Sequence, residues 1–440
     1  MNPRLTHQLT HSRTAKLPGE AVGLAWTQGR RFARWSFGEG GVQLGGLATP
    51  ITYSRAGNAT VWDADPKLVG RGDNVMRIDH DPATGELIGL LGESEKVNTP
   101  LQSEDFSTWT PNNCTVSVSA TSAPRVGSQC YDLASTDTAA NRGYLTHATT
   151  GLTGAATVTV SVFVKKGHLI RLQPNTTIGG TVSGITLNFN TATNAVTGAG
   201  SAYGNFSYIG AGIIDCGVWC RVFVTFGVTG TMGSLAFWVF PHIVTGGATQ
   251  TATIFGAQAE AGGLSSYIPT SGSQATRQGD TLTTPTTWFD PSGGIFLAKV
   301  RVYPGSIHTG IDNNILSLGA GVNIISLRLR RGANGNITVV VGSGSDNSFL
   351  SIGGAPSAAE WEYLALVYST TNGSFLIRKT GSGVAAASTK GVNYSGNLPA
   401  QMTLFQNLNG HDQTLEYQRG QFATAADAIA VLNQWCATNT

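Results

Sequence analysis

Apolar side chains recur at every second position in several short stretches of this chain, and that period constrains the fold more than any other feature. In the clearest stretch, residues 157–164, four valines occupy alternate positions. Because successive side chains of a β-strand point to opposite faces, this period predicts a half-buried antiparallel strand. Similar stretches occur at 187–190, 219–226, 235–240 and 251–257. The pattern predicts an all-β fold.

The composition favours short strands joined by tight turns. Glycine accounts for 57 of the 440 residues, and only 12% of the residues are charged. Glycine adopts the positive φ angles that tight turns need and that other residues avoid. Regular short strands without amphipathic helices between them predict antiparallel β-sandwiches of the jelly-roll kind. The formal net charge of +2 argues against a nucleic-acid-binding protein, which usually has a strongly basic domain.

Changes in sequence pattern divide the chain into three segments. Residues 1–95 have poor apolar periodicity, and residues 96–280 form the first predicted sandwich. Residues 281–440 form the second sandwich, and its first seven residues, rich in Thr and restrained by Pro285, predict an extended linker. Further strands are expected at 293–303, 324–329, 336–341, 361–368 and 375–379.

The chain is expected to end in a short helix over residues 424–435. Thr424 can cap the first turn, and Asp427 suits the positive end of the helix dipole. Four apolar residues follow at the spacing i, i+3, i+4 and i+7, which is the apolar stripe of a helix that packs on a core. They are Ala428, Val431, Leu432 and Trp435.

The N-terminal segment is rich in cations and aromatic rings. Positions 1–40 carry six Lys or Arg residues against two Glu residues. Arg and aromatic residues are enriched in interface cores, and exposed aromatic clusters usually pack on a partner. We therefore expect a region that docks on a larger particle and joins subunits; an irregular layer on the first sandwich is the alternative. The expected docking residues are Trp26, Arg30, Arg31, Phe32, Arg34 and Trp35.

Seven short motifs occur in a fixed order through the middle of the chain. They are LIGLLGESE (87–95), LQSEDFSTW (101–109), VSVFVKKG (160–167), GVWCRV (217–222), GAQAEAG (256–262), SYIPT (266–270) and TRQGD (276–280). In this order they resemble a carbohydrate-binding-like β-sandwich module of tail-fibre and head-spike proteins from bacteriophages, and a gene transfer agent would fit equally.

The last segment resembles a second family of sandwiches. The motifs EWEYLALVY (360–368), TTNGSF (370–375) and EYQRGQFAT (416–424) are similar to those of concanavalin A or laminin G domains. The resemblance implies a second jelly-roll-like sandwich that packs the C-terminal helix.

Together the resemblances imply a fibre or spike subunit on the virion surface that attaches the particle to a bacterial cell-surface glycan without cleaving it. Fibres of this kind are usually trimers, so the resemblance also implies a homo-oligomer that contacts other virion proteins. Two alternatives stay open, a depolymerase that cleaves the same glycan and a structural collar or decoration protein without a ligand. The first residues lack the apolar core of a signal peptide, and the longest apolar run is half of what spans a bilayer. We therefore expect synthesis in the bacterial cytoplasm, release by lysis and no membrane insertion.

The carboxylates form no recognisable catalytic pattern. Glycoside hydrolysis needs two carboxylates that face each other across a sugar. Glu260 is close to a predicted strand end, which favours a structural role, while Glu360 and Glu362 alternate on a predicted strand and are expected on its solvent face. Glu416 is the fourth main acid. There is no nucleophile elbow, phosphate loop or His-Glu-x-x-His zinc motif, so we expect a protein that is not an enzyme.

Binding is the chemistry that the residue types favour. Sugars are recognised by aromatic rings that stack on their C–H faces and by amide, carboxylate and Arg groups that bind their hydroxyls. The candidates in the first sandwich are Arg171, Tyr203, Tyr208, Trp238 and His242. The candidates in the second sandwich are Asp312, Asn314, Tyr394, Asn409, His411 and Asp412.

Metal and disulfide chemistry have weak signals. The five cysteines have no zinc spacing and are expected as buried free thiols, with a Cys114–Cys130 disulfide as the alternative. No cofactor is expected. The run Asp312-Asn313-Asn314 offers the hard oxygens that bind structural Ca²⁺, although three adjacent residues do not define a site.

Overall fold

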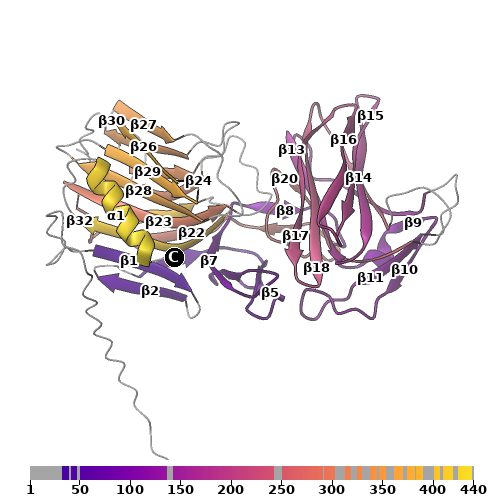
Figure 1. Ribbon diagram of the computed structural model, residues 1–440. Coiled ribbons are helices and arrows are strands. Elements are labelled where there is room, and N and C mark those ends of the chain that lie inside the picture. The colour runs from indigo at the N-terminus through magenta and orange to yellow at the C-terminus, as the bar shows by residue number, and fades with distance from the viewer. Residues whose placement is uncertain are drawn as a thin grey trace, which may run out of the picture. The chain divides into compact units, whose positions relative to one another are not determined.

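The computed structural model describes most of residues 32–302 and the regular elements that follow them. The described ranges are 32–38, 41–46, 50–135, 142–241, 250–290, 292–302, 313–318, 325–329, 337–343, 346–352, 361–369, 374–381, 383–389, 401–406, 410–419 and 425–438. Apart from the single turn η1 (Phe106–Thr108) and the helix α1 (Ala425–Thr438), the elements in these ranges are β-strands (Figure 1). The all-β prediction is confirmed.

The first sandwich consists of two six-stranded antiparallel sheets. Sheet 1 has the order β10 (Cys114–Val118), β11 (Tyr131–Ser135), β20 (Thr251–Ala261), β13 (Thr157–Lys165), β18 (Trp219–Val228) and β17 (Phe206–Cys216). Sheet 2 has the order β16 (Ala195–Tyr203), β15 (Thr181–Asn190), β14 (Leu169–Ile178), β19 (Leu235–Phe240), β12 (Tyr144–Thr149) and β9 (Thr110–Asn112).

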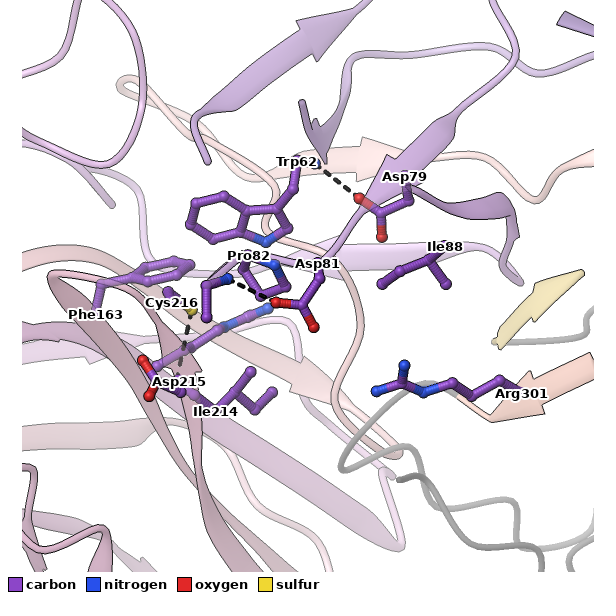
Figure 2. A pocket seen from close by; sticks show the side chains of 12 residues that line it. Trp62, Asp79, Asp81, Pro82, Ile88, Phe163, Ile214, Asp215, Cys216 and Arg301 are labelled. Atoms are coloured by element: carbon purple, nitrogen blue, oxygen red, sulfur yellow. Dashed lines mark hydrogen bonds between the residues drawn. The ribbon is translucent and has the colours of Figure 1, made fainter. Parts of the chain in front are cut away.

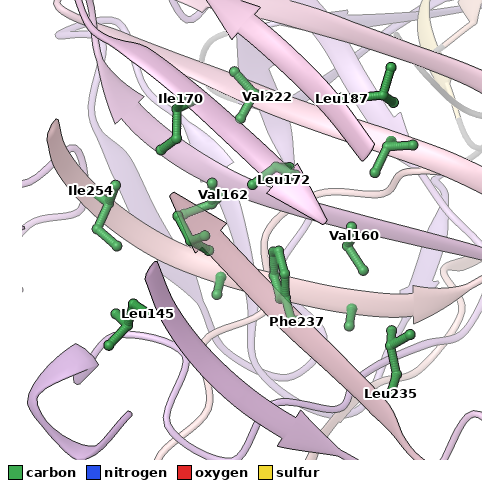
Figure 3. Packing of buried hydrophobic residues seen from close by; sticks show 14 of the residues in the cluster. Leu145, Val160, Val162, Ile170, Leu172, Leu187, Val222, Leu235, Phe237 and Ile254 are labelled. Carbon is green, nitrogen blue, oxygen red and sulfur yellow. The ribbon is translucent and has the colours of Figure 1, made fainter. Parts of the chain in front are cut away.

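The period-two residues of both sheets meet in one apolar core. Val160 and Val162 of sheet 1 face Leu172 and Phe237 of sheet 2, and all four are fully buried (Figure 3). Burial of side chains of this size stabilises the fold by about 1.5–3 kcal/mol each. This core explains why the valine alternation predicted a strand at residues 157–164.

The other face of β13 differs from its prediction, because it is buried rather than exposed. Phe163 makes an edge contact with Tyr267, with ring centroids 5.7 Å apart, and another with Trp62 at 6.2 Å. The hydroxyl of Thr159 donates to the carbonyl of Gly262 (2.6 Å). Residues of the connecting segments thus cover the outer face of sheet 1.

The second sandwich also consists of two antiparallel sheets. One contains β2 (Gly41–Gly46), β1 (Phe32–Gly38), β32 (Gly410–Arg419), β23 (Gly293–Val302), β28 (Glu362–Ser369), β29 (Ser374–Thr380) and β30 (Gly383–Thr389), with β7 (Leu87–Gly92) and β6 (Ile78–His80) attached through β32. The other contains β27 (Asp346–Ile352), β26 (Ile337–Ser343), β25 (Ile325–Leu329), β24 (Asn313–Leu318), β31 (Gln401–Gln406), β22 (Thr281–Pro285) and β3 (Thr52–Ser54).

The N-terminal strands differ from the irregular region that the sequence predicted. β1 pairs with β32, and the ring of Trp35 is fully buried in the core of the second sandwich, 5.0 Å from the ring of Trp288. Phe37 lies in the same core. Trp35 is therefore a core residue rather than an exposed docking residue, because its own chain supplies the apolar surface that the prediction assigned to a partner.

The predicted linker at residues 281–287 begins with a strand of the same sandwich. β22 pairs with β3 on one side and β31 on the other, and Leu282 and Thr284 are buried. The Thr-rich composition suggested a linker, although the residues alternate between buried and partly exposed positions as in a strand. The helix prediction is confirmed: α1 packs against β28 and β29, and its four predicted apolar residues are all buried (Figure 1).

Short strands join the two sandwiches. They are β4 (Ala59–Trp62), β5 (Leu68–Arg71), β8 (Lys96–Asn98) and β21 (Ala275–Arg277). β8 pairs with β21, so the chain enters and leaves the first sandwich through one two-stranded ribbon. The first sandwich is therefore inserted into the sequence of the second.

A cluster of fully buried ion pairs stabilises these connections. The Arg77 guanidinium binds the carboxylates of both Glu93 and Asp280, and Arg277 Nη1 lies 2.8 Å from Glu93 Oε2. The backbone N–H and hydroxyl of Ser266 also donate to Glu93, at 2.7 and 2.6 Å. Four of these residues fall inside the ordered motifs, at 87–95, 266–270 and 276–280, so those motifs encode a structural cluster.

Candidate functional site

The two outer faces of the first sandwich differ in accessibility. The outer face of sheet 1 is covered around β13, whereas the outer face of sheet 2 carries half-buried aromatic and polar side chains. Cross-strand partners share a face, so the strand registers define its residues. We call this surface the aromatic face; its central residues are Tyr144, Arg171, Gln173, Asn188, Tyr203 and Trp238.

Two stacked rings form the centre of the aromatic face. Tyr144 of β12 and Trp238 of β19 have ring centroids 4.5 Å apart and planes inclined by only 15°. Trp238 lies opposite Gln173 in the register between β14 and β19. Stacked rings of this kind hold each other in place, so the pair presents a rigid apolar wall beside an amide group.

A third ring lies further along the same face. Tyr203 is 39% exposed and lies opposite Gly184, and a Cβ at Gly184 would come within 2.4 Å of the Tyr203 hydroxyl. The tyrosine therefore lies across the glycine. β16 and β19 are separated by two strands, which places Tyr203 roughly 14 Å from Trp238 across the sheet.

Arg171 is the cation of this face. Its Nε donates to the Oδ1 of Asn188 (2.7 Å), and its guanidinium carbon lies 5.8 Å from the ring centroid of Phe240. Burial lowers the pKa of Arg171, and the nearby charge of Arg142 lowers that pKa further. The guanidinium stays charged at neutral pH because the reference pKa of arginine is above 12.

The structure thus places three of the five candidates from the first sandwich on one face: Arg171, Tyr203 and Trp238. Tyr208 is exposed but lies on β17 of sheet 1. His242 lies outside the described residues, as do Asp312, Tyr394 and Asn409 of the second sandwich. The backbone of Asn314 belongs to β24, whereas His411 and Asp412 belong to β32 in the opposite sheet. Among the expected docking residues, Trp26, Arg30 and Arg31 lie outside the described ranges, Phe32 begins β1, and Arg34 Nε donates to the Ser36 hydroxyl (3.3 Å).

Sequence reasoning missed Tyr144, Gln173 and Asn188. A signal was present for two of them, because Gln173 is two positions from Arg171 on one strand and Asn188 lies between the core residues Leu187 and Phe189. Tyr144 was missed because no strand was predicted at β12.

A cavity of about 220 Å³ is a second candidate (Figure 2). Trp62, Phe163, Asp79, Asp81 and Asp215 line it, with Arg221 and Arg301. Its acids already serve the local backbone: Asp79 accepts the N–H of Trp62 (2.8 Å), and Asp81 accepts those of Ala83 and Thr84 (2.9 and 3.0 Å). Asp79 and Asp81 are therefore engaged in backbone contacts, and we place the functional site on the aromatic face.

Two of the four candidate catalytic acids have described side chains, and both occupy structural positions. Glu260 is fully buried and accepts the N–H and hydroxyl of Ser265 at 3.0 and 2.6 Å, in line with its predicted role. Glu362 is buried and paired with Arg378, which corrects its prediction as a solvent-face residue. Glu360 lies outside the described residues.

The cysteine prediction is confirmed in its main form. All five cysteines are free and buried, so the alternative Cys114–Cys130 disulfide does not form. Burial raises the pKa of the Cys114 thiol to about 11. Within the described ranges, no group of three or more His, Cys, Asp or Glu residues is arranged to hold a metal ion. In the same part of the chain, no helix has the length and apolar character required to cross a bilayer.

Comparison with known proteins identifies no sequence family. No family model matches the chain, and no curated protein matches its sequence. The described strands define the class directly, as an all-β protein with two antiparallel sandwiches, one inserted into the other.

Some solved structures are similar to it in part. The LG1-3 region of the laminin alpha2 chain matches with a TM-score of 0.24 and 13% identity, over 62% of this chain and 63% of that one. Domains LG4-5 of the mouse laminin alpha1 chain match with a TM-score of 0.20 and 11% identity, over 73% and 86% of the two chains. At TM-scores this low, the architecture is assigned from the strand registers of the chain itself.

Proposed function

We propose that this protein is a non-enzymatic adhesin that binds a glycan of the bacterial surface on its aromatic face. The observation that carries the proposal is the stacked pair Tyr144–Trp238 beside Arg171, Gln173 and Asn188. Binding sites for small molecules combine aromatic walls with a few placed polar groups. A pyranose offers C–H faces to aromatic rings and hydroxyls to amide and guanidinium groups, so both parts of this face have a partner in a sugar.

We propose further that the chain is a fibre or spike subunit on the surface of a phage-like particle. Support comes from the resemblance of the ordered motifs to that class and from the arrangement of two sandwiches in one chain. A single sugar site binds weakly, whereas several linked copies raise avidity by about 10²–10⁴. A homo-oligomer, proposed as a trimer, would supply those copies.

Trp238→Ala tests the glycan site. We expect it to weaken binding to host surface polysaccharide about tenfold or more, because it removes half of the stacked pair. The measurement is binding of the full chain to immobilised polysaccharide. The matched control is Trp361→Ala, which truncates a partly exposed tryptophan beside Lys299 in the second sandwich and should leave binding unchanged.

If only the Trp361→Ala variant loses binding, the glycan site lies on the second sandwich. The same incubation also tests the non-enzymatic assignment. New reducing ends or unsaturated sugars released from the polysaccharide would contradict it.

Deletion of residues 1–30 tests the proposed docking region and leaves every described strand in place. We expect the shortened chain to lose its oligomeric mass in light scattering and to fail to join particles. Its glycan affinity per site should stay the same. A shortened chain that keeps the full oligomer and still joins particles would show that docking lies elsewhere.

A further inference from the structure

The charge distribution on sheet 2 is one-sided. The sequences of its six strands contain no Asp or Glu, and Arg171 is their only Lys or Arg. A further cation, the exposed Arg142, lies two residues before Tyr144. The residues that could stack on a sugar are thus accompanied by positive charge on strands that carry no carboxylate.

Arg171 is held in a fixed position at the edge of the stacked rings. It is only 8% exposed, its Nε is bound to Asn188, and its guanidinium lies over Phe240. Phe240 lies two residues from Trp238 on β19 and 5.1 Å from the ring of Tyr144. An arginine is rarely buried to this extent, because removal of its charge from water is costly.

The neighbouring charge of Arg142 increases that cost. Burial and the charge of Arg142 both lower the pKa of Arg171, so both disfavour its charged form. An anion bound beside Arg171 would be attracted by both positive charges. Guanidinium groups bind carboxylate and phosphate through two parallel hydrogen bonds, which suits them to sugars that carry these groups.

We propose that the glycan bound on the aromatic face is anionic, and that Arg171, assisted by Arg142, holds its carboxylate or phosphate group while a sugar ring packs on Tyr144 and Trp238. This inference rests on the proposed function and names the ligand class for the same site. It makes Arg171 the residue that selects acidic over neutral glycans.

The test is an array of bacterial polysaccharides probed with the full chain. Each acidic polysaccharide is printed beside its carboxyl-reduced form, and each phosphorylated one beside its dephosphorylated form. We expect the chain to bind acidic members at least about tenfold more tightly than their neutralised partners, with affinity that falls as salt rises. If removal of carboxylate causes the larger loss of affinity, the bound group is a carboxylate; if removal of phosphate does, the bound group is a phosphate.

Arg171→Gln should reduce the ratio of acidic to neutralised affinity to near one. Arg171→Lys should retain part of that ratio, because lysine keeps the positive charge but lacks the planar guanidinium that forms two parallel hydrogen bonds. Arg71→Gln on β5 is the control for loss of one positive charge and should keep the preference. Thermal unfolding of each variant separates lost recognition from lost folding. Equal binding to acidic and neutralised members would overturn the inference and leave the proposed function standing. No binding to any member would overturn both.

Discussion

Arg77→Met is expected to destabilise the protein by about 3–5 kcal/mol, because it removes the charge shared by two buried carboxylates and leaves each with one remaining arginine, Arg277 for Glu93 and Arg55 for Asp280. Glu93 and Asp280 both bind Arg77, and all three side chains are inaccessible to solvent. The free energy of unfolding can be measured by urea denaturation with tryptophan fluorescence. Arg125→Met is the matched control: its pair with Glu104 is 2.8 Å long but 29% and 20% exposed, so its loss should cost about 1 kcal/mol or less.

The same cluster should make the protein sensitive to acid. Burial alone would raise the pKa of Glu93, but Arg277 and Arg77 outweigh burial and hold that pKa well below its usual range. A carboxylate with a lowered folded-state pKa stabilises the protein above its unfolded pKa, about 4.3, and this contribution is lost as pH falls below that value. In the Glu93→Gln variant, the free energy of unfolding should therefore fall less steeply than in the unmodified protein as the pH drops below ~4. The Arg77 and Arg125 variants could lose the same free energy of unfolding, and Glu93→Gln could leave the pH dependence of stability below pH ~4 unchanged. Those two results together would show that the cluster contributes little to stability.

Trp35→Ala is expected to destabilise the second sandwich by about 3–5 kcal/mol, the usual cost of truncating a fully buried tryptophan. The Trp35 ring packs on Trp288, which is more than 250 residues away in sequence. The substitution therefore leaves a cavity beside Trp288. Leu44→Ala is the control in the same hairpin, because Leu44 lies opposite Trp35 in the register but is 46% exposed. Its cost should stay within about 0.5 kcal/mol. If the two variants unfold at the same urea concentration, β1 is not an integral strand of the second sandwich.

The strands and the site differ in how far the sequence could predict them. Local alternation was sufficient for β13 and β18, because each strand's period lies within its own ten or so residues. β1 also alternates, with Trp35 and Phe37 inward, but its partner β32 lies near the other end of the chain. No local pattern could show that its rings are covered by the same molecule.

The site depended on registers that are not local. Residue type alone selected Arg171 and Trp238, but only the pairing of β14 with β19 places Trp238 opposite Gln173. A register shift of one residue would have placed Trp238 in the core. The ordered motifs carried a different kind of information, since several of their polar residues, such as Glu93 and Arg277, form the buried cluster.

The pairing of β1 with β32 has a consequence for the order in which the chain folds during synthesis. β1 leaves the ribosome first, yet its partner is made about 370 residues later, which at cellular rates is a delay of roughly 20–75 s. The first sandwich lies wholly within that interval and can complete its core while Trp35 and Phe37 still lack theirs. Nascent chains should therefore expose this hairpin until β32 has been made, which makes it a segment that a chaperone would protect.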